Sequence, residues 1–69
     1  MEHYIFRTKA QAKKFDKECR AHSILVENET PYIMHIHDVN NIKDDRRPHV
    51  IDTARKIYCQ IMGYPFFPA

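Results

Sequence analysis

The chain has 69 residues, 43% of them apolar, and its 11 Lys and Arg residues against 9 Asp and Glu residues give a net charge of +2 at pH 7. A chain of this length forms one small domain, and this apolar content is typical of a globular rather than a disordered protein. The low net charge argues against a dedicated polyanion binder. No apolar run approaches the roughly 20 residues that span a bilayer, so the sequence predicts no transmembrane helix.

The N-terminal segment is charged and amphipathic, unlike a signal peptide, and the two cysteines do not resemble a secreted disulfide framework. We therefore expect a soluble, cytoplasmic protein with reduced thiols and without contact to a membrane. The charges are distributed unevenly: residues 1–22 carry +3, residues 23–42 carry −3 and residues 43–69 carry +2. Basic ends and an acidic middle favour self-association or a polar partner.

The first two expected elements are a short strand and a helix. Apolar and polar side chains alternate over residues 3–7, which predicts a strand. Thr8-Lys9-Ala10-Gln11 then matches the capping box that begins many helices, so we expect a helix near residues 9–21. One outer face of this helix would carry a basic stripe.

Two further strands follow in the sequence. Residues 24–27 form a branched apolar run, residues 28–30 are predicted to turn, and residues 32–39 alternate as a strand that returns antiparallel. Tyr32, Met34 and Ile36 would face the core. The opposite face of that strand would carry Ile33, His35, His37 and Val39.

A second helix is expected near residues 48–62. Pro48 suits a first helical turn, an apolar stripe continues to Met62, and Gly63 is typical of the residue that ends a helix. The tail after it is rich in aromatic side chains.

The element order is therefore β-α-β-β-α. We predict a small α+β domain over residues 1–69, in which a three-stranded mixed sheet carries both helices on one face. The third strand would pair antiparallel with the second or lie between the first two. The other sheet face would stay uncovered, and a patch with apolar members on such a face usually marks an interface.

The leading functional hypothesis is a non-enzymatic binding protein, acting as a regulator, inhibitor or adaptor through contact with another protein, with self-association as a homodimer. No nucleophile–base–orienter set is recognisable, so we expect neither an enzyme nor a cofactor. The residues expected at the protein interface lie on the open sheet face and in the aromatic tail: Ile5, Arg7, Ile33, His35, His37, Tyr64, Phe66 and Phe67.

Two alternatives remain. Nucleic acid could be bound by the basic face of the first helix, whose members are Lys9, Lys13, Lys14, Lys17 and Arg20. A transition metal could be bound by the histidines that share the open sheet face, namely His3, His35 and His37. We rank the metal site last because the predicted strands place no acidic side chain on that face.

Overall fold

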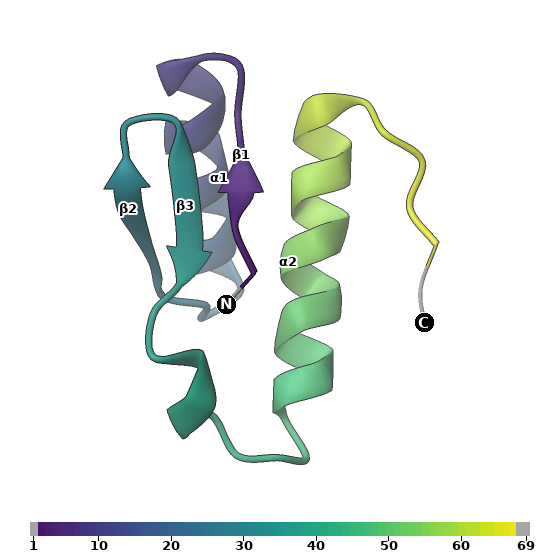
Figure 1. Cartoon of the computed structure of the whole chain (residues 1–69). Helices are drawn as coiled ribbons and strands as arrows, with labels where there is room; N and C mark the ends of the chain where they lie inside the picture. Colours follow the sequence, from purple (N-terminus) through teal and green to yellow (C-terminus); the bar gives the residue numbers. More distant parts are fainter. Residues whose placement is uncertain (1, 68–69) are drawn as a thin grey trace.

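The computed structural model describes residues 2–67, and the element order is the expected β-α-β-β-α. The elements are β1 (Tyr4–Ile5), α1 (Lys9–Ala21), β2 (Val26–Thr30), β3 (Ile33–Ile36), a short 3-10 helix η1 (Val39–Asn41) and α2 (Arg47–Met62) (Figure 1). The prediction of a small α+β domain is confirmed. Neither helix combines the length and the hydropathy needed to cross a membrane within these residues.

The sheet has the order β1-β3-β2, so β3 occupies the middle position. Tyr4 pairs with Met34 on one side and Val26 pairs with Ile36 on the other, and both pairings are antiparallel. The third strand thus lies between the first two, which was one of the two expected arrangements. The sheet is antiparallel rather than mixed, because β1 and β2 run in the same direction but are separated by β3.

The β2–β3 hairpin turns later than the sequence suggested. Residues 28–30 belong to β2, with a change of register between Asn28 and Thr30, and the turn falls at Pro31 and Tyr32. The Thr30 hydroxyl accepts hydrogen bonds from the amides of Tyr32 and Ile33, both at 3.1 Å, and Pro31 suits the first central position of such a turn. Tyr32 is consequently exposed rather than part of the core.

Both helices begin and end close to the predicted residues. At the start of α1, the Thr8 hydroxyl accepts a hydrogen bond from the Gln11 amide at 3.1 Å, and the Gln11 side chain accepts one from the Thr8 amide at 3.2 Å. In α2, Pro48 lies in the first turn. Gly63 ends α2 in the left-handed conformation with φ +76°, which glycine adopts without a steric penalty.

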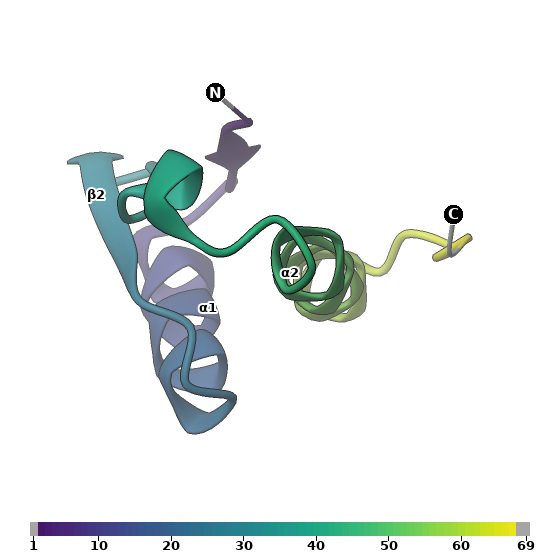
Figure 2. The same cartoon turned by 90° about the horizontal axis from the view of Figure 1, so that it is seen from below.

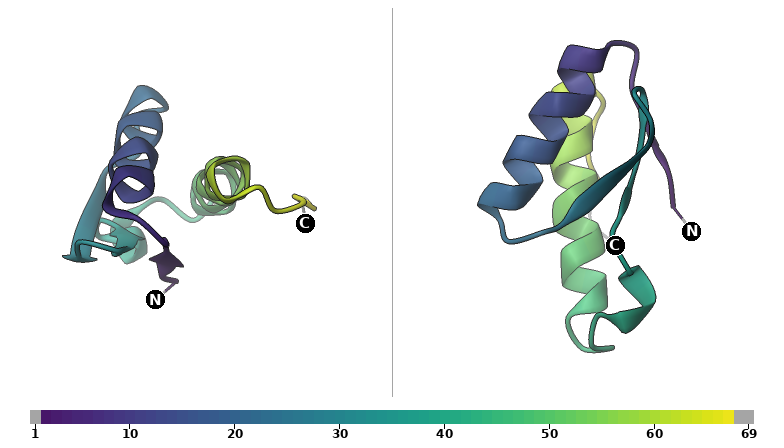
Figure 3. Two further views of the ribbon diagram at one scale, coloured as in Figure 1. Left: turned by 90° about the horizontal axis from the view of Figure 1, so that it is seen from above. Right: turned by 90° about the vertical axis from the view of Figure 1, so that its left-hand side faces the viewer.

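The two helices lie on the same side of the sheet, as predicted (Figure 3). Helix α2 packs beside α1. In the view along the α2 axis, α2 lies apart from β2, on the β1 side of the molecule (Figure 2). The Tyr58 hydroxyl donates a hydrogen bond to the Ile5 carbonyl at 2.8 Å and thereby ties α2 to β1. Beneath the sheet lies one core, which includes Tyr4, Phe6, Ala12, Phe15, Cys19, Ile24, Val26, Met34, Ile36, Val50, Ala54 and Ile57.

One residue expected on the open face lies elsewhere. Asp38 adopts a left-handed backbone conformation with φ +49°, which ends the extended chain before Val39. Val39 begins η1 and packs against the core. The open face therefore has less apolar surface than the sequence suggested.

Candidate functional site

The sheet face away from the helices contains a pair of isoleucines. Ile5 of β1 stands directly opposite Ile33 of β3, and both side chains point away from the buried Tyr4 and Met34. Ile5 is 58% exposed and Ile33 is half-buried. Around this small apolar centre the same face is polar.

Histidines and glutamates form the polar part of the open face. Glu27 pairs with two imidazoles: its Oε2 lies 2.9 Å from His35 Nε2, and its Oε1 lies 2.5 Å from His37 Nδ1. His3 Nε2 lies 3.1 Å from Glu29 Oε2. The expectation that no acid lies on this face was wrong. Glu27 lies within the segment predicted as a strand and pairs with His35, and the extension of β2 to Thr30 adds Glu29.

The electrostatics of this cluster centre on Glu27. Hydrogen bonds from His37 and then His35 lower the pKa of the Glu27 carboxyl, so it stays ionised over a wider pH range. His35 Nδ1 is buried without a hydrogen-bond partner in the part of the chain that the structure describes. A buried lone pair costs less than a buried unpaired N–H, so the geometry favours the tautomer that carries its proton on Nε2 and donates to Glu27.

The three histidines predicted as metal ligands do not all converge. His3 and His35 come together with Glu29, and one ligand atom from each of these residues lies within 4.8 Å of the other two. The rings of His3 and His35 have centroids 6.2 Å apart. His37 pairs with Glu27 instead and lies outside this group.

The residues predicted to bind a partner divide into two surfaces. Ile5, Ile33, His35 and His37 share the sheet face, whereas the aromatic tail runs on the side of α2 away from the sheet (Figures 1 and 2). Arg7 belongs with the tail, because its Nη2 lies 3.5 Å from the Tyr64 hydroxyl.

Within the tail, the side chains differ in their surroundings. The Tyr64 ring packs against Tyr58 with the centroids 6.1 Å apart. Phe66 is half-buried, and Phe67 is 83% exposed. Residues 64–67 of the tail therefore do not cover the sheet (Figures 1 and 2).

The predicted basic face of α1 is present and open to solvent. All five of its Lys and Arg side chains are exposed: Lys9, Lys13, Lys14, Lys17 and Arg20. Arg20 is paired within the helix, with its Nε 2.6 Å from Asp16 Oδ1. Within residues 2–67 the four lysines make no ion pair, which leaves a positive surface along α1.

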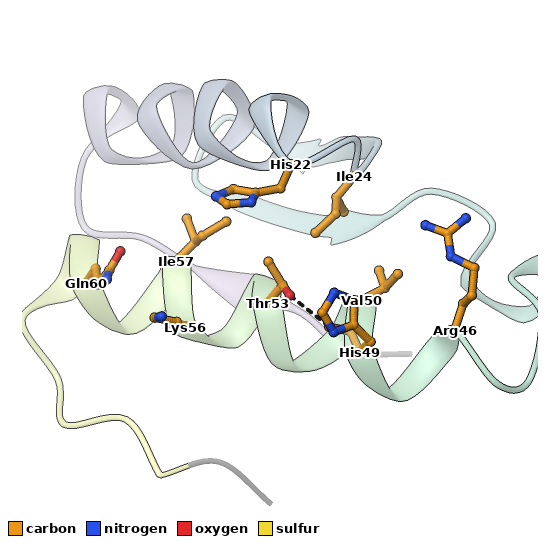
Figure 4. A pocket seen from close by; sticks show the side chains of 9 residues that line it. All are labelled: His22, Ile24, Arg46, His49, Val50, Thr53, Lys56, Ile57 and Gln60. Carbon is orange, nitrogen blue, oxygen red and sulfur yellow. Dashed lines mark hydrogen bonds between the residues drawn. The ribbon is translucent and has the colours of Figure 1, made fainter.

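A groove between the end of α1 and the length of α2 was not foreseen from the sequence (Figure 4). Its volume is about 390 Å³. Its lining residues are His22, Ile24, Arg46, His49, Val50, Thr53, Lys56, Ile57 and Gln60. Apolar side chains of the core thus meet a basic and polar rim.

The rim of the groove is positively charged and has no acidic member. Arg46 and Lys56 make no ion pair within residues 2–67, and the lining contains neither Asp nor Glu. The Thr53 hydroxyl donates a hydrogen bond to the His49 carbonyl at 2.9 Å (Figure 4). Two free cations beside an apolar wall form a surface that attracts an anion with an apolar part.

A sequence signal for this groove exists in part. His49, Thr53, Lys56 and Gln60 recur at intervals of four, three and four residues, so they form a polar stripe on α2. The stripe alone resembles any solvated helix face. Only the packing of α1 beside α2 brings His22 and Ile24 opposite it and forms the groove.

Comparison with known protein families, with curated proteins and with solved structures finds no match to the chain. Two surfaces of the molecule have a defined chemistry, namely the basic groove and the histidine–glutamate cluster.

Proposed function

We propose that the protein is a non-enzymatic binding protein whose groove between α1 and α2 recognises an acidic segment of another protein. The observation that carries this proposal is the groove lining, in which Arg46 and Lys56 flank an apolar wall and no acid neutralises them. A regulator, inhibitor or adaptor works through this kind of contact.

The chemistry of the groove indicates what such a segment contains. A guanidinium group binds a carboxylate through two parallel hydrogen bonds, and an ammonium group attracts it as a point charge. Ile24 and Ile57 form the floor of the groove, and because they are only 5% and 4% exposed they offer a narrow apolar surface to the partner. The groove therefore suits a segment that places acidic side chains next to apolar ones.

The groove favours a protein over a nucleic acid. A nucleic acid presents a phosphate at every nucleotide and is held by many cations at once, whereas the groove offers two permanent charges and an apolar wall. The lysines along α1 fit phosphates better, but they belong to a different surface. Nucleic-acid binding is therefore an outcome that the experiment must distinguish.

Fluorescence anisotropy with defined peptides tests the proposal. The probe is a labelled peptide that alternates Glu and Leu, and its counterpart alternates Lys and Leu. We expect the acidic peptide to bind saturably and the basic one not to bind. Lys56→Glu should weaken binding of the acidic peptide about tenfold or more, equivalent to about 1.4 kcal/mol, because the variant places a like charge in the groove.

Lys14→Glu is the matched control, since it changes the net charge equally at an exposed position of α1 outside the groove. It should alter the affinity for the acidic peptide less than twofold. An equal loss in both variants would show that net charge, not the groove, attracts the peptide. If a mixed-sequence oligonucleotide binds instead, with strong salt dependence and loss in Lys14→Glu, the nucleic-acid alternative replaces this proposal.

Self-association is a special case of the same proposal. Residues 23–42 carry a net charge of −3 and could supply the acidic segment from a second copy. Light scattering of the isolated chain measures this directly. A dimer that dissociates in Lys56→Glu but persists in Lys14→Glu would identify the second copy as the partner.

A further inference from the structure

The open sheet face carries a second set of groups, distinct from the groove. We propose that His3, Glu29 and His35 form a site for a divalent transition-metal ion of the zinc type. Each of the three residues offers one ligand atom, and these atoms lie within 4.8 Å of one another. His3 Nε2 and Glu29 Oε2 are already 3.1 Å apart.

The distances are close to those that a bound ion requires. Zinc holds imidazole nitrogens and carboxylate oxygens at about 2.0–2.2 Å in a tetrahedron, which places neighbouring ligand atoms about 3.3 Å apart. No separation in the cluster must therefore shrink by more than about 1.5 Å. His3 and Glu29 have side chains that are 40% and 50% exposed, so rotation of these two side chains can bring the atoms together.

The sheet fixes the relative positions of the ligands. His3 precedes β1, whose Tyr4 pairs with Met34, and this register brings His3 beside His35 of β3. Glu29 comes from β2 on the other side of β3, where the change of register lies next to it. The three ligands thus come from or beside three different strands.

The donor set and the local charge select the kind of ion. Two imidazoles and one carboxylate match zinc and its neighbours in the transition series, whereas calcium and magnesium prefer oxygen ligands alone. Glu27 adds a second carboxylate beside the site. Residues 23–42, which contain β2 and β3, include no Lys or Arg that would repel a cation. Three protein ligands leave a fourth position open to water or to another ligand.

The hydrogen bonds of His35 limit the affinity. To bind the ion through Nε2, His35 must release Glu27 and carry its ring proton on Nδ1, which is buried without an acceptor in the described chain. Ligating histidines ordinarily donate that second N–H to an acceptor, and loss of such a partner costs 10–100-fold in affinity. We therefore expect this site to bind zinc about 10–100-fold more weakly than a site in which that N–H has an acceptor.

Isothermal titration with zinc chloride, using the full chain without a histidine tag, tests this site. We expect one zinc ion per chain. His3→Ala and Glu29→Gln should each weaken zinc binding tenfold or more, and both positions are exposed, so the variants should keep the circular dichroism spectrum of the parent. Cobalt should bind at the same site with the intense visible absorption of a tetrahedral complex.

Two other histidines provide the controls. His22→Ala lies outside the cluster and should leave the zinc affinity unchanged. His37→Ala should also retain one zinc ion per chain, since His37 is not among the three ligands. Absence of saturable binding in the parent, or equal binding in His3→Ala and Glu29→Gln, would refute the site. Loss of zinc in His37→Ala as large as in His3→Ala would refute the assigned ligand set.

Discussion

Replacement of Phe15 by alanine should remove a large part of the stability of this domain. The ring is 0% exposed and lies among the rings of Tyr4 and Phe6, with centroids 5.0 and 5.1 Å away. A buried aromatic side chain removes at least about 150 Å² from water, which at about 25 cal/mol per Å² is close to 4 kcal/mol. Measured costs of such truncations are about 3–5 kcal/mol.

That loss is large compared with what a chain of this size possesses. At about 0.05–0.15 kcal/mol per residue, the whole domain is stable by only about 3–10 kcal/mol. Urea unfolding followed by circular dichroism measures the change. With a slope of about 1 kcal/mol per molar urea, the midpoint for Phe15→Ala should fall by about 3–5 M, or the variant should be unfolded without urea.

Phe67→Ala is the matched control, because it removes the same side chain from a position that is 83% exposed. It should change the free energy of unfolding by less than about 0.5 kcal/mol. If Phe15→Ala stays within 1 kcal/mol of the parent, the helices and the sheet do not share the aromatic core described above.

Three further predictions concern the thiols, a loop contact and the pH range. Burial raises the pKa of the Cys19 thiol to about 12, so alkylation of the native protein at pH 8 should modify the half-buried Cys59 first, and mass spectrometry should find Cys19 modified only after unfolding. Arg47→Met should lower the free energy of unfolding by about 1.5–3 kcal/mol, because the guanidinium donates to the carbonyls of Val39 and Asn40 in η1 and of Ile42 just after it, at 2.7 to 3.2 Å. Urea unfolding measures this, and a loss below about 0.5 kcal/mol would contradict it. Burial and the hydrogen bond to Glu2 raise the pKa of the Tyr4 phenol above its value of about 10 in the unfolded chain. The protonated phenol therefore stabilises the folded state below about pH 10, and this stabilisation is lost as the pH rises further. Tyrosine absorbance followed alongside circular dichroism should therefore show Tyr4 ionising together with alkaline unfolding, and its ionisation in a still folded protein would contradict the burial.

The helices were predictable because their signals are local. The hydroxyl of Thr8 and the side chain of Gln11 act within one turn, and Gly63 ends α2 through its own backbone conformation. The position of the hairpin turn was harder to predict, because residues 28–30 have a composition suited to a turn. The structure places the turn at Pro31 instead, where proline fits the backbone angle and Thr30 supplies the hydrogen-bond acceptor.

The candidate sites depended on contacts that the sequence does not encode locally. Glu27 lies in the segment that was already predicted as a strand, and it pairs with His35 on the outer face. The later turn lengthens β2 and adds Glu29 beside His3 on the same face. The groove combines one stripe of α2 with His22 at the end of α1, far away in the chain. Its position depends on how the two helices pack, and the apolar periodicity of a single helix does not encode that packing.

The position of β1 has a consequence for how the chain reaches its fold during synthesis. Tyr4 and Phe6 leave the ribosome before their partners, because β1 completes its hydrogen bonds with β3 and with Tyr58, which is 53 residues away from Ile5. Translation at about 5–20 residues per second separates these partners by about 3–10 seconds. For that time α1, through Phe15, is the part of the core that can cover the two aromatic side chains. Early binding by a chaperone, or aggregation when it is absent, should therefore begin at the first strand.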